Sequence, residues 1–181
     1  GDDTSTHVFV VSGTGEPGDT VEEDAGGSDQ TTTIQDDGTW SVTYEGNTFT
    51  ADGTAATTVL FSHAGGGETT MNGPLFVIDT TGPDVAFASG VDSTGHIVNG
   101  TELAGGVTLT GTGEAGAALV ITIAGVTRAT TVSDAGTWSA TWQAGTLAAG
   151  EYASDVTVVA TESFGNTTTV SDTLVVDTVA E

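Results

Sequence analysis

The stretch Ser12-Gly-Thr-Gly-Glu16-Pro-Gly18 returns later in the chain as Thr110-Gly-Thr-Gly-Glu114-Ala-Gly116. Two more stretches return in the same way: Asp36-Asp-Gly-Thr-Trp40 as Asp134-Ala-Gly-Thr-Trp138, and Phe76-Val-Ile-Asp79-Thr80 as Leu174-Val-Val-Asp177-Thr178. The members of each pair lie 98 residues apart. A constant offset predicts two tandem copies of one module, aligned without a net insertion. A repeat this long exceeds the periods of roughly 20–50 residues found in solenoids and propellers, so each copy should be a domain.

Short runs rich in β-branched residues alternate with Gly, Asp and Asn turns, and no stretch has convincing helical periodicity. The pattern predicts an all-β chain of two tandem immunoglobulin-like Greek-key sandwiches. Trp40 and Trp138 follow matching glycine turns and should anchor the two cores. Strands are expected in the first copy near residues 8–11, 20–23, 31–34, 39–44, 56–61 and 71–78, and in the second near 84–87, 107–110, 119–123, 129–132, 137–142, 153–161 and 167–176.

The expected domains are residues 1–78 and 84–181, joined by a short linker at 79–83 that Pro83 stiffens. The second copy has residues 83–100 ahead of its second strand, whereas the first copy has only residues 1–6 there. The first sandwich should therefore lack its N-terminal strand A. Either the chain begins inside a repeat or another chain supplies that strand.

The charge of the chain is one-sided. The chain has one basic residue, Arg128, and 25 Asp and Glu residues, which gives a formal net charge of −24. Nothing in the chain could neutralise phosphates, which argues against nucleic acid and anionic membranes as partners. Salty water or bound divalent cations would relieve the self-repulsion. Cysteine is absent, so no disulfide stabilises the fold.

The repeated motifs, together with Thr161-Glu-Ser-Phe-Gly-Asn166 and Asp79-Thr-Thr-Gly-Pro83, resemble the bacterial immunoglobulin-like extender repeats of giant repeats-in-toxin surface adhesins. The resemblance covers almost all of the second copy and most of the first. It implies an extracellular protein on a bacterial cell surface, made of many neighbouring repeats that support adhesion and biofilm attachment. It also implies Ca²⁺ at the domain junctions, where the ion stiffens the rod.

Strand order indicates a cation site at the same junction. In a seven-strand Greek-key sandwich, the loops after the second, fourth and sixth strands meet at the pole where strand A begins. Carboxylate and amide oxygens on these loops and on the linker would give Ca²⁺ the six to eight oxygen ligands, roughly, that it prefers, with backbone carbonyls completing the shell. The expected ligands are Asp79, Thr81, Asp84, Glu114, Asp134, Glu162 and Asn166.

The first copy departs from this pattern. Glu16 and Asp36 match Glu114 and Asp134, but at the constant offset Ala64 and Glu68 stand opposite Glu162 and Asn166. A site at this pole is therefore not expected, and Glu16 and Asp36 are weaker candidates. Asp177 matches Asp79 and would serve a following repeat. Glu22, Glu23 and Asp24 have no acidic counterparts and are expected on an exposed strand.

Catalysis is not expected. His7, His63 and His96 do not align with one another, and no nucleophile elbow or histidine-rich metal motif is present. Two alternatives to a pure spacer stay open. One is an immunoglobulin-like module that binds a sugar or a protein. The other is a filament subunit whose open first sandwich exchanges a strand with another chain.

Overall fold

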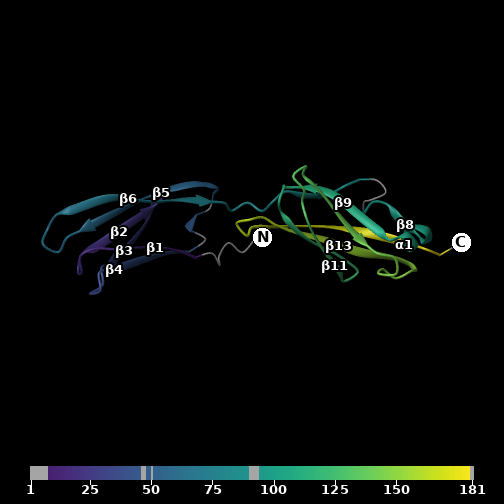
Figure 1. The fold of residues 1–181 in the computed structure, drawn as a ribbon, viewed down its shortest axis with the longest axis horizontal. Helices are drawn as coiled ribbons and strands as arrows, with labels where there is room; N and C mark the ends of the chain where they lie inside the picture. The colour runs from purple at the N-terminus through teal and green to yellow at the C-terminus, as the bar shows by residue number, and fades with distance from the viewer. Residues whose placement is uncertain (1–7, 46–47, 50, 90–93, 180–181) are drawn as a thin grey trace. The chain divides into compact units, whose positions relative to one another are not determined.

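A computed structural model describes residues 8–45, 48–49, 51–89 and 94–179 (Figure 1). The chain divides into two compact units, with the boundary between Thr80 and Thr81. We call them repeat 1 and repeat 2, and each is described by itself. Within the described residues, no helix is long and apolar enough to span a membrane.

Repeat 2 is a sandwich of two sheets. One sheet has the strand order β12-β9-β7, and the other has the order β11-β10-β13-β14-β8. All neighbours are antiparallel except β8, which runs parallel to the end of β14. The elements are β7 (Val85–Phe87), β8 (Ile97–Asn99), α1 (Gly100–Gly105), β9 (Val107–Gly113), β10 (Ala118–Ile123), β11 (Val126–Thr131), β12 (Thr137–Trp142), β13 (Glu151–Thr161) and β14 (Thr167–Asp177).

Repeat 1 has the same architecture over its described residues, with a β1-β4 sheet packed on a β3-β2-β5-β6 sheet. Its strands are β1 (Val8–Thr14), β2 (Thr20–Ala25), β3 (Ser28–Thr33), β4 (Thr39–Glu45), β5 (Gly53–Ser62) and β6 (Glu68–Ile78). Each expected strand is present at or close to its predicted position. The predicted fold class, two immunoglobulin-like β-sandwiches, is confirmed.

The two cores are separate, and the tryptophans occupy equivalent places in them. Trp40 and Trp138 are 6% and 3% exposed, and each is the second residue of its strand. Alternation along every core-facing strand explains the packing, since every second side chain points inward. In β12, for example, Trp138, Ala140 and Trp142 are buried and the residues between them are exposed.

The two copies do not align at one constant offset. Thr20 pairs with Ser62 across β2 and β5, whereas Ala118 pairs with Thr161 across β10 and β13. Because Thr20 and Ala118 are 98 residues apart and Ser62 and Thr161 are 99 apart, repeat 1 is one residue shorter before its β5–β6 turn.

A β-bulge in β6 restores the missing residue. Ala56 pairs with Leu75 and Thr58 with Asn72, so Thr57 alone faces two residues of β6. Those two residues are Gly73 and Pro74, and Thr57 closes the bulge by donating from Oγ1 to the Pro74 carbonyl at 2.8 Å. Proline is tolerated at such a position because a residue in a bulge is left unpaired and need not donate an N–H to the neighbouring strand. The overall offset of 98 therefore combines a deletion with a compensating insertion.

The N-terminal part of repeat 2 contains two elements that the sequence reading missed, β8 and α1. Val98 and Leu103 from these elements are buried in the core. Asn99 caps the helix by accepting from the Thr101 and Glu102 amides, and the Glu102 carboxylate accepts from the Asn99 amide. This capping box was visible in the sequence as Asn-x-x-Glu.

The predicted absence of strand A from repeat 1 concerns residues 1–6, which lie outside the described residues. Over the described residues, β1 pairs with β4 alone, whereas its counterpart β9 lies between β12 and β7.

The expectation that Glu22, Glu23 and Asp24 all lie on an exposed strand is wrong for Glu23. Glu22 is exposed, but Glu23 is fully buried, because it has the inward-facing position that Ile121 has in repeat 2. The Tyr44 hydroxyl lies against the Glu23 carboxylate and donates to the Glu23 carbonyl at 2.8 Å. Burial raises the pKa of Glu23, although the hydrogen bond with Tyr44 opposes the shift.

Candidate cation sites at the loop poles

The turns that should hold the ion in repeat 2 lie at one end of the sandwich. Gly113 N donates to Gly136 O at 3.0 Å, so the β9–β10 turn is tied to the β11–β12 turn. The pairing of Ala118 with Thr161 brings the β13–β14 turn to the same end. The segment before β7 joins them, since Glu114 N donates to Asp84 O at 2.9 Å. The structure therefore brings the backbones of Asp84 and Glu114 together.

Glu162 is engaged within its own turn. Its carboxylate accepts from the amides of Phe164 at 2.5 Å and Asn166 at 2.8 Å. Desolvation raises the pKa of Glu162, but these amide donors outweigh it and hold the pKa below its usual value. A carboxylate stabilised in its ionised form suits a cation ligand, although part of its lone-pair capacity is used by the turn. Asn166 is buried beside it.

The other predicted ligands are spread over the units. Glu114 and Asp134 are exposed on their turns, as is Thr81 before β7. Asp79 is half-buried directly after β6 in repeat 1, and Asp177 ends β14, where it accepts from Val179 N at 3.2 Å. Their joint ligation of an ion stays a prediction.

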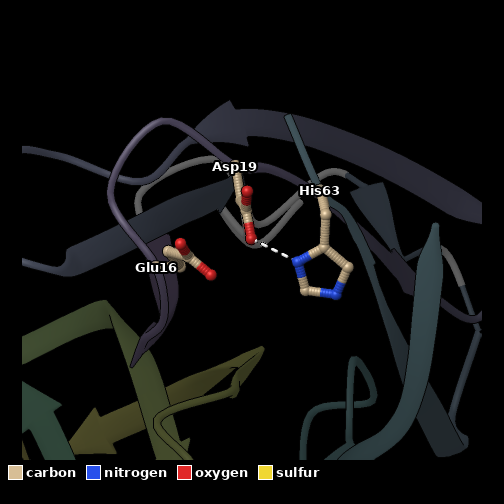
Figure 2. A group of neighbouring side chains, drawn as sticks. All are labelled: Glu16, Asp19 and His63. Carbon is tan, nitrogen blue, oxygen red and sulfur yellow. Dashed lines mark hydrogen bonds and ion pairs between the residues drawn. The ribbon is translucent and has the colours of Figure 1, made fainter. Parts of the chain in front are cut away.

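Repeat 1 brings together three groups at the equivalent pole. Ligand atoms of Glu16, Asp19 and His63 all lie within 4.8 Å of one another, the only such group of three acidic or histidine residues among those that the structure describes. Figure 2 shows the Glu16 carboxylate pointing toward the other two side chains. His63 Nδ1 lies 2.6 Å from Asp19 Oδ2, and Ala64 N donates to Asp19 Oδ1 at 3.0 Å.

Asp19 is the anchor of this group. It is 3% exposed, and the Ala64 amide, followed by His63, holds its pKa below the usual value. Asp19 follows the tight β1–β2 turn, in which its own amide donates to Glu16 O at 3.2 Å. The turn therefore fixes both acids on one short segment, and the β5–β6 turn brings the histidine to them.

The register shift corrects the sequence reading of this pole. His63 N donates to Gly67 O just as Glu162 N donates to Asn166 O, so His63 and Gly67 are the equivalents of Glu162 and Asn166. Ala64 and Glu68, which the constant offset placed there, each lie one position further along. Sequence reasoning missed both Asp19 and His63. Asp36, the other candidate at this pole, is exposed on the β3–β4 turn.

The two poles differ in donor chemistry. Repeat 2 offers only oxygen donors, the ligands that Ca²⁺ prefers. Repeat 1 offers two carboxylates and an imidazole, a mixed set that also suits transition metals. Both ring nitrogens of His63 already have partners, because Nε2 lies 3.3 Å from Thr69 Oγ1. An ion that took His63 as a ligand would have to displace one of these two contacts.

The chain is similar to solved structures of bacterial adhesins. One is a Ca²⁺-stabilized adhesin that helps an Antarctic bacterium reach out and bind ice: it is 29% identical, with 96% of this chain and 45% of that chain covered and a TM-score of 0.58. Another comes from work on host cell surface retention of a 1.5-MDa bacterial ice-binding adhesin, at 23% identity, with 98% and 60% covered and a TM-score of 0.54.

A bacterial immunoglobulin-like domain from the M. primoryensis ice-binding adhesin is also 29% identical, covering 55% of this chain and 100% of that chain with a TM-score of 0.38. The chain spans about half the length of the first two solved chains. No protein-family model matches it, and no curated protein is significantly similar. The resemblance read from the motifs is confirmed: the chain consists of tandem immunoglobulin-like repeats similar to those of large bacterial adhesins.

Proposed function

We propose that this chain is a two-repeat segment of the extender region of a bacterial cell-surface adhesin, stiffened by calcium where repeats join. Its work is mechanical. It holds more distal parts of an extracellular protein away from the cell and so supports adhesion and biofilm attachment. The observation that carries the proposal is its 29% identity, over nearly its whole length, to an adhesin described as Ca²⁺-stabilized.

The loop pole of repeat 2 supplies the chemistry for a junction ion. Asp84 lies beside Glu114 through a backbone hydrogen bond, and Glu162 is held in a state that favours ionisation. Because the chain has a net charge of −24, a divalent cation would also relieve repulsion between these acids. Asp79 and Thr81, on either side of the boundary between the units, would complete the shell.

The free energy of calcium binding at such a site is small compared with the stability of a domain, but large enough to hold a hinge that has few other contacts. With millimolar calcium and a Kd of about 10⁻⁴ M, binding contributes about 1.4 kcal/mol. The Trp40 and Trp138 cores do not depend on it. Chelation should therefore loosen the junction without unfolding either repeat.

Small-angle scattering tests this mechanism on the whole chain. With calcium we expect one narrow distribution of extended shapes, and with chelator at matched ionic strength a broader and shorter one. Glu114→Ala should give the broad distribution even in calcium. Glu22→Ala, which removes an exposed acid from strand β2, is the matched control and should keep the calcium response. A profile that does not change on chelation would refute calcium stiffening.

The main rival function is recognition of a sugar or protein by the sandwich itself. A pure extender should bind nothing on a glycan array or in a pull-down with surface proteins, whereas a binding module should give a saturable signal. The similarity to adhesin domains favours a non-enzymatic structural module over either catalysis or recognition.

A further inference from the structure

The dipeptide Asn-Gly occurs twice in the chain, as Asn72-Gly73 in β6 and as Asn99-Gly100 where α1 begins. Asn-Gly is chemically labile in water. The main-chain nitrogen of the glycine can attack the side-chain carbonyl carbon of the asparagine, because glycine has no side chain to obstruct the approach. The structure places the two dipeptides in different surroundings, and these surroundings decide which of them can react.

Asn72 carries no restraint on its side chain. It is exposed to water, and its side-chain amide has no hydrogen-bond partner among the described residues. The bulge in β6 begins at the next residue, since Gly73 and Pro74 together face Thr57. A bulge locally disrupts the ladder and leaves its extra residue unpaired. The main chain at Gly73 is therefore released from the regular pairing that would hold its nitrogen away from the Asn72 side chain.

The bulge also requires the glycine. A Cβ built on Gly73 would clash with Thr57 Oγ1 and lie 3.2 Å from Thr57 Cβ. The same Thr57 hydroxyl closes the bulge by donating to the Pro74 carbonyl at 2.8 Å. A larger residue at position 73 would therefore displace Thr57 and open the bulge. The fold keeps beside Asn72 the residue that permits the attack.

Asn99 is exposed as well, but its side chain is held in place. Its Oδ1 accepts from the amides of Thr101 at 2.9 Å and Glu102 at 3.0 Å. Attack on the Asn99 side chain would first have to break these two bonds and disturb the first turn of α1. Loss of such a helix cap costs about 1 kcal/mol. The reaction at Asn99 therefore has a barrier that the reaction at Asn72 does not have.

We propose that Asn72 is a site of spontaneous deamidation. The Gly73 nitrogen bonds to Cγ of Asn72, the bond from Cγ to Nδ2 breaks, and Nδ2 leaves as ammonia with the proton of the Gly73 N–H. The product is a five-membered imide. Water then adds to one of the two imide carbonyl groups and opens the ring, which leaves either aspartate or isoaspartate. Water is the only other reactant, and Asn99 stays unmodified while repeat 2 is folded.

The modification changes repeat 1 in two ways. Either product adds one negative charge to a chain whose net charge is already −24. Isoaspartate also inserts a methylene group into the main chain of β6, directly before the bulge. Residues 75–78 follow the bulge and pair with residues 53–56 of β5. We expect this pairing to weaken, so that the amides of residues 53–56 exchange faster with solvent.

The test is incubation of the intact chain at mildly alkaline pH, both folded and in urea, followed by mass spectrometry of the peptides that contain each asparagine. In the folded chain Asn72 should lose ammonia at least about tenfold faster than Asn99, because only Asn99 must first break its cap. In urea the two rates should converge, since neither side chain is held. Ion exchange should detect the added charge, and the exchange of residues 53–56 should rise with the isoaspartate fraction.

Asn72→Gln is the matched control. It keeps an exposed amide at this position, but its longer side chain closes an imide ring far more slowly, so the folded variant should stay unmodified. Equal rates at Asn72 and Asn99 in the folded chain would overturn the proposal. A rate ratio that persists unchanged in urea would also overturn it, because the local sequence and not the fold would then set the difference. Either result would leave the calcium response in small-angle scattering, which tests the extender function, unaffected.

Discussion

Replacing Glu23 with isoleucine should stabilise repeat 1. Glu23 is fully buried, and its Oε1 has no hydrogen-bond partner among the described residues. Isoleucine is the residue at the equivalent position of repeat 2, where Ile121 is also fully buried. Tyr44 would lose the carboxylate but keep the backbone carbonyls of residue 23 and Ser28 as acceptors.

The size of the effect follows from two contributions. An unsatisfied buried polar group costs about 1–3 kcal/mol, and burying an isoleucine side chain contributes about 1.5–3 kcal/mol. Allowing for the lost bond to Tyr44 and imperfect repacking, we expect a net gain of about 2 kcal/mol. For a domain of this length that corresponds to a rise in Tm of roughly 10 °C.

The pH dependence has a definite sign. Because the folded-state pKa of Glu23 is raised above 4.5, its protonated form favours folding. The stability of repeat 1 is then greatest below the unfolded pKa and falls as pH rises toward the folded pKa, by up to about 1.4 kcal/mol per pH unit. Glu23→Ile and Glu23→Gln should both abolish this slope, and only Glu23→Ile should also raise stability.

Native-state hydrogen exchange of the β2 and β4 amides reads repeat 1 separately from repeat 2, and calorimetry gives the Tm. Glu22→Ile is the control, since it removes the same charge from the exposed face of β2. Its effect should be within about 0.5 kcal/mol. The reasoning fails if Glu23→Ile destabilises repeat 1, if the pH slope persists in it, or if Glu22→Ile matches it.

Three further outcomes are expected. Asp19→Ala should speed hydrogen exchange of the Ala64 amide about tenfold or more, because that amide loses its acceptor. In the parent protein, the protection of the Ala64 amide should be lost only as pH falls below the usual Asp value of 3.8, since the folded-state pKa of Asp19 lies lower. An Ala64 amide whose exchange responds neither to Asp19→Ala nor to low pH would contradict this. Gly111→Ala should lower the stability of repeat 2 by about 3 kcal/mol in a denaturant titration, because the new Cβ would lie 2.1 Å from Ala86 O. Gly105→Ala is the control and should be near neutral, because the space around Gly105 is open. Trp40→Phe should cost repeat 1 less than Trp138→Phe costs repeat 2, since only Trp138 Nε1 has a hydrogen bond to lose; equal costs in denaturant melts would contradict this.

The strands were predictable because their alternation survives in both copies. The β12 segment, with Trp138, Ala140 and Trp142 inward, follows period two without exception. The short elements β8 and α1 were not predicted, since three strand residues and six helical residues are too few for periodicity. Only the capping box at Asn99 marked them.

The expectation for the pole of repeat 1 depended on aligning the two copies at one constant offset, and that alignment is wrong at the β5–β6 turn. A deletion before Ser62 and a bulge at Pro74 cancel in length, so the three landmark motifs keep one offset while the β5–β6 turn between them is displaced by one residue. A shift of one residue along a strand moves every side chain to the other face of the sheet. The same shift in the β5–β6 turn makes His63, and not Ala64, the equivalent of Glu162.

Buried acids were misread for a related reason. Charge was taken as a sign of exposure, but position along a strand decides which face a side chain occupies. Val21, Glu23 and Ala25 alternate inward as Leu119, Ile121 and Ile123 do, so alignment with a core isoleucine was the better evidence. Repeat 1 thus keeps the inward pattern of its neighbour while placing a carboxyl group, a tyrosine and Thr57 where repeat 2 has Ile121, Trp142 and Val156. A polar core of this kind costs stability unless every group is satisfied, and the lone Oε1 of Glu23 shows that here it is not.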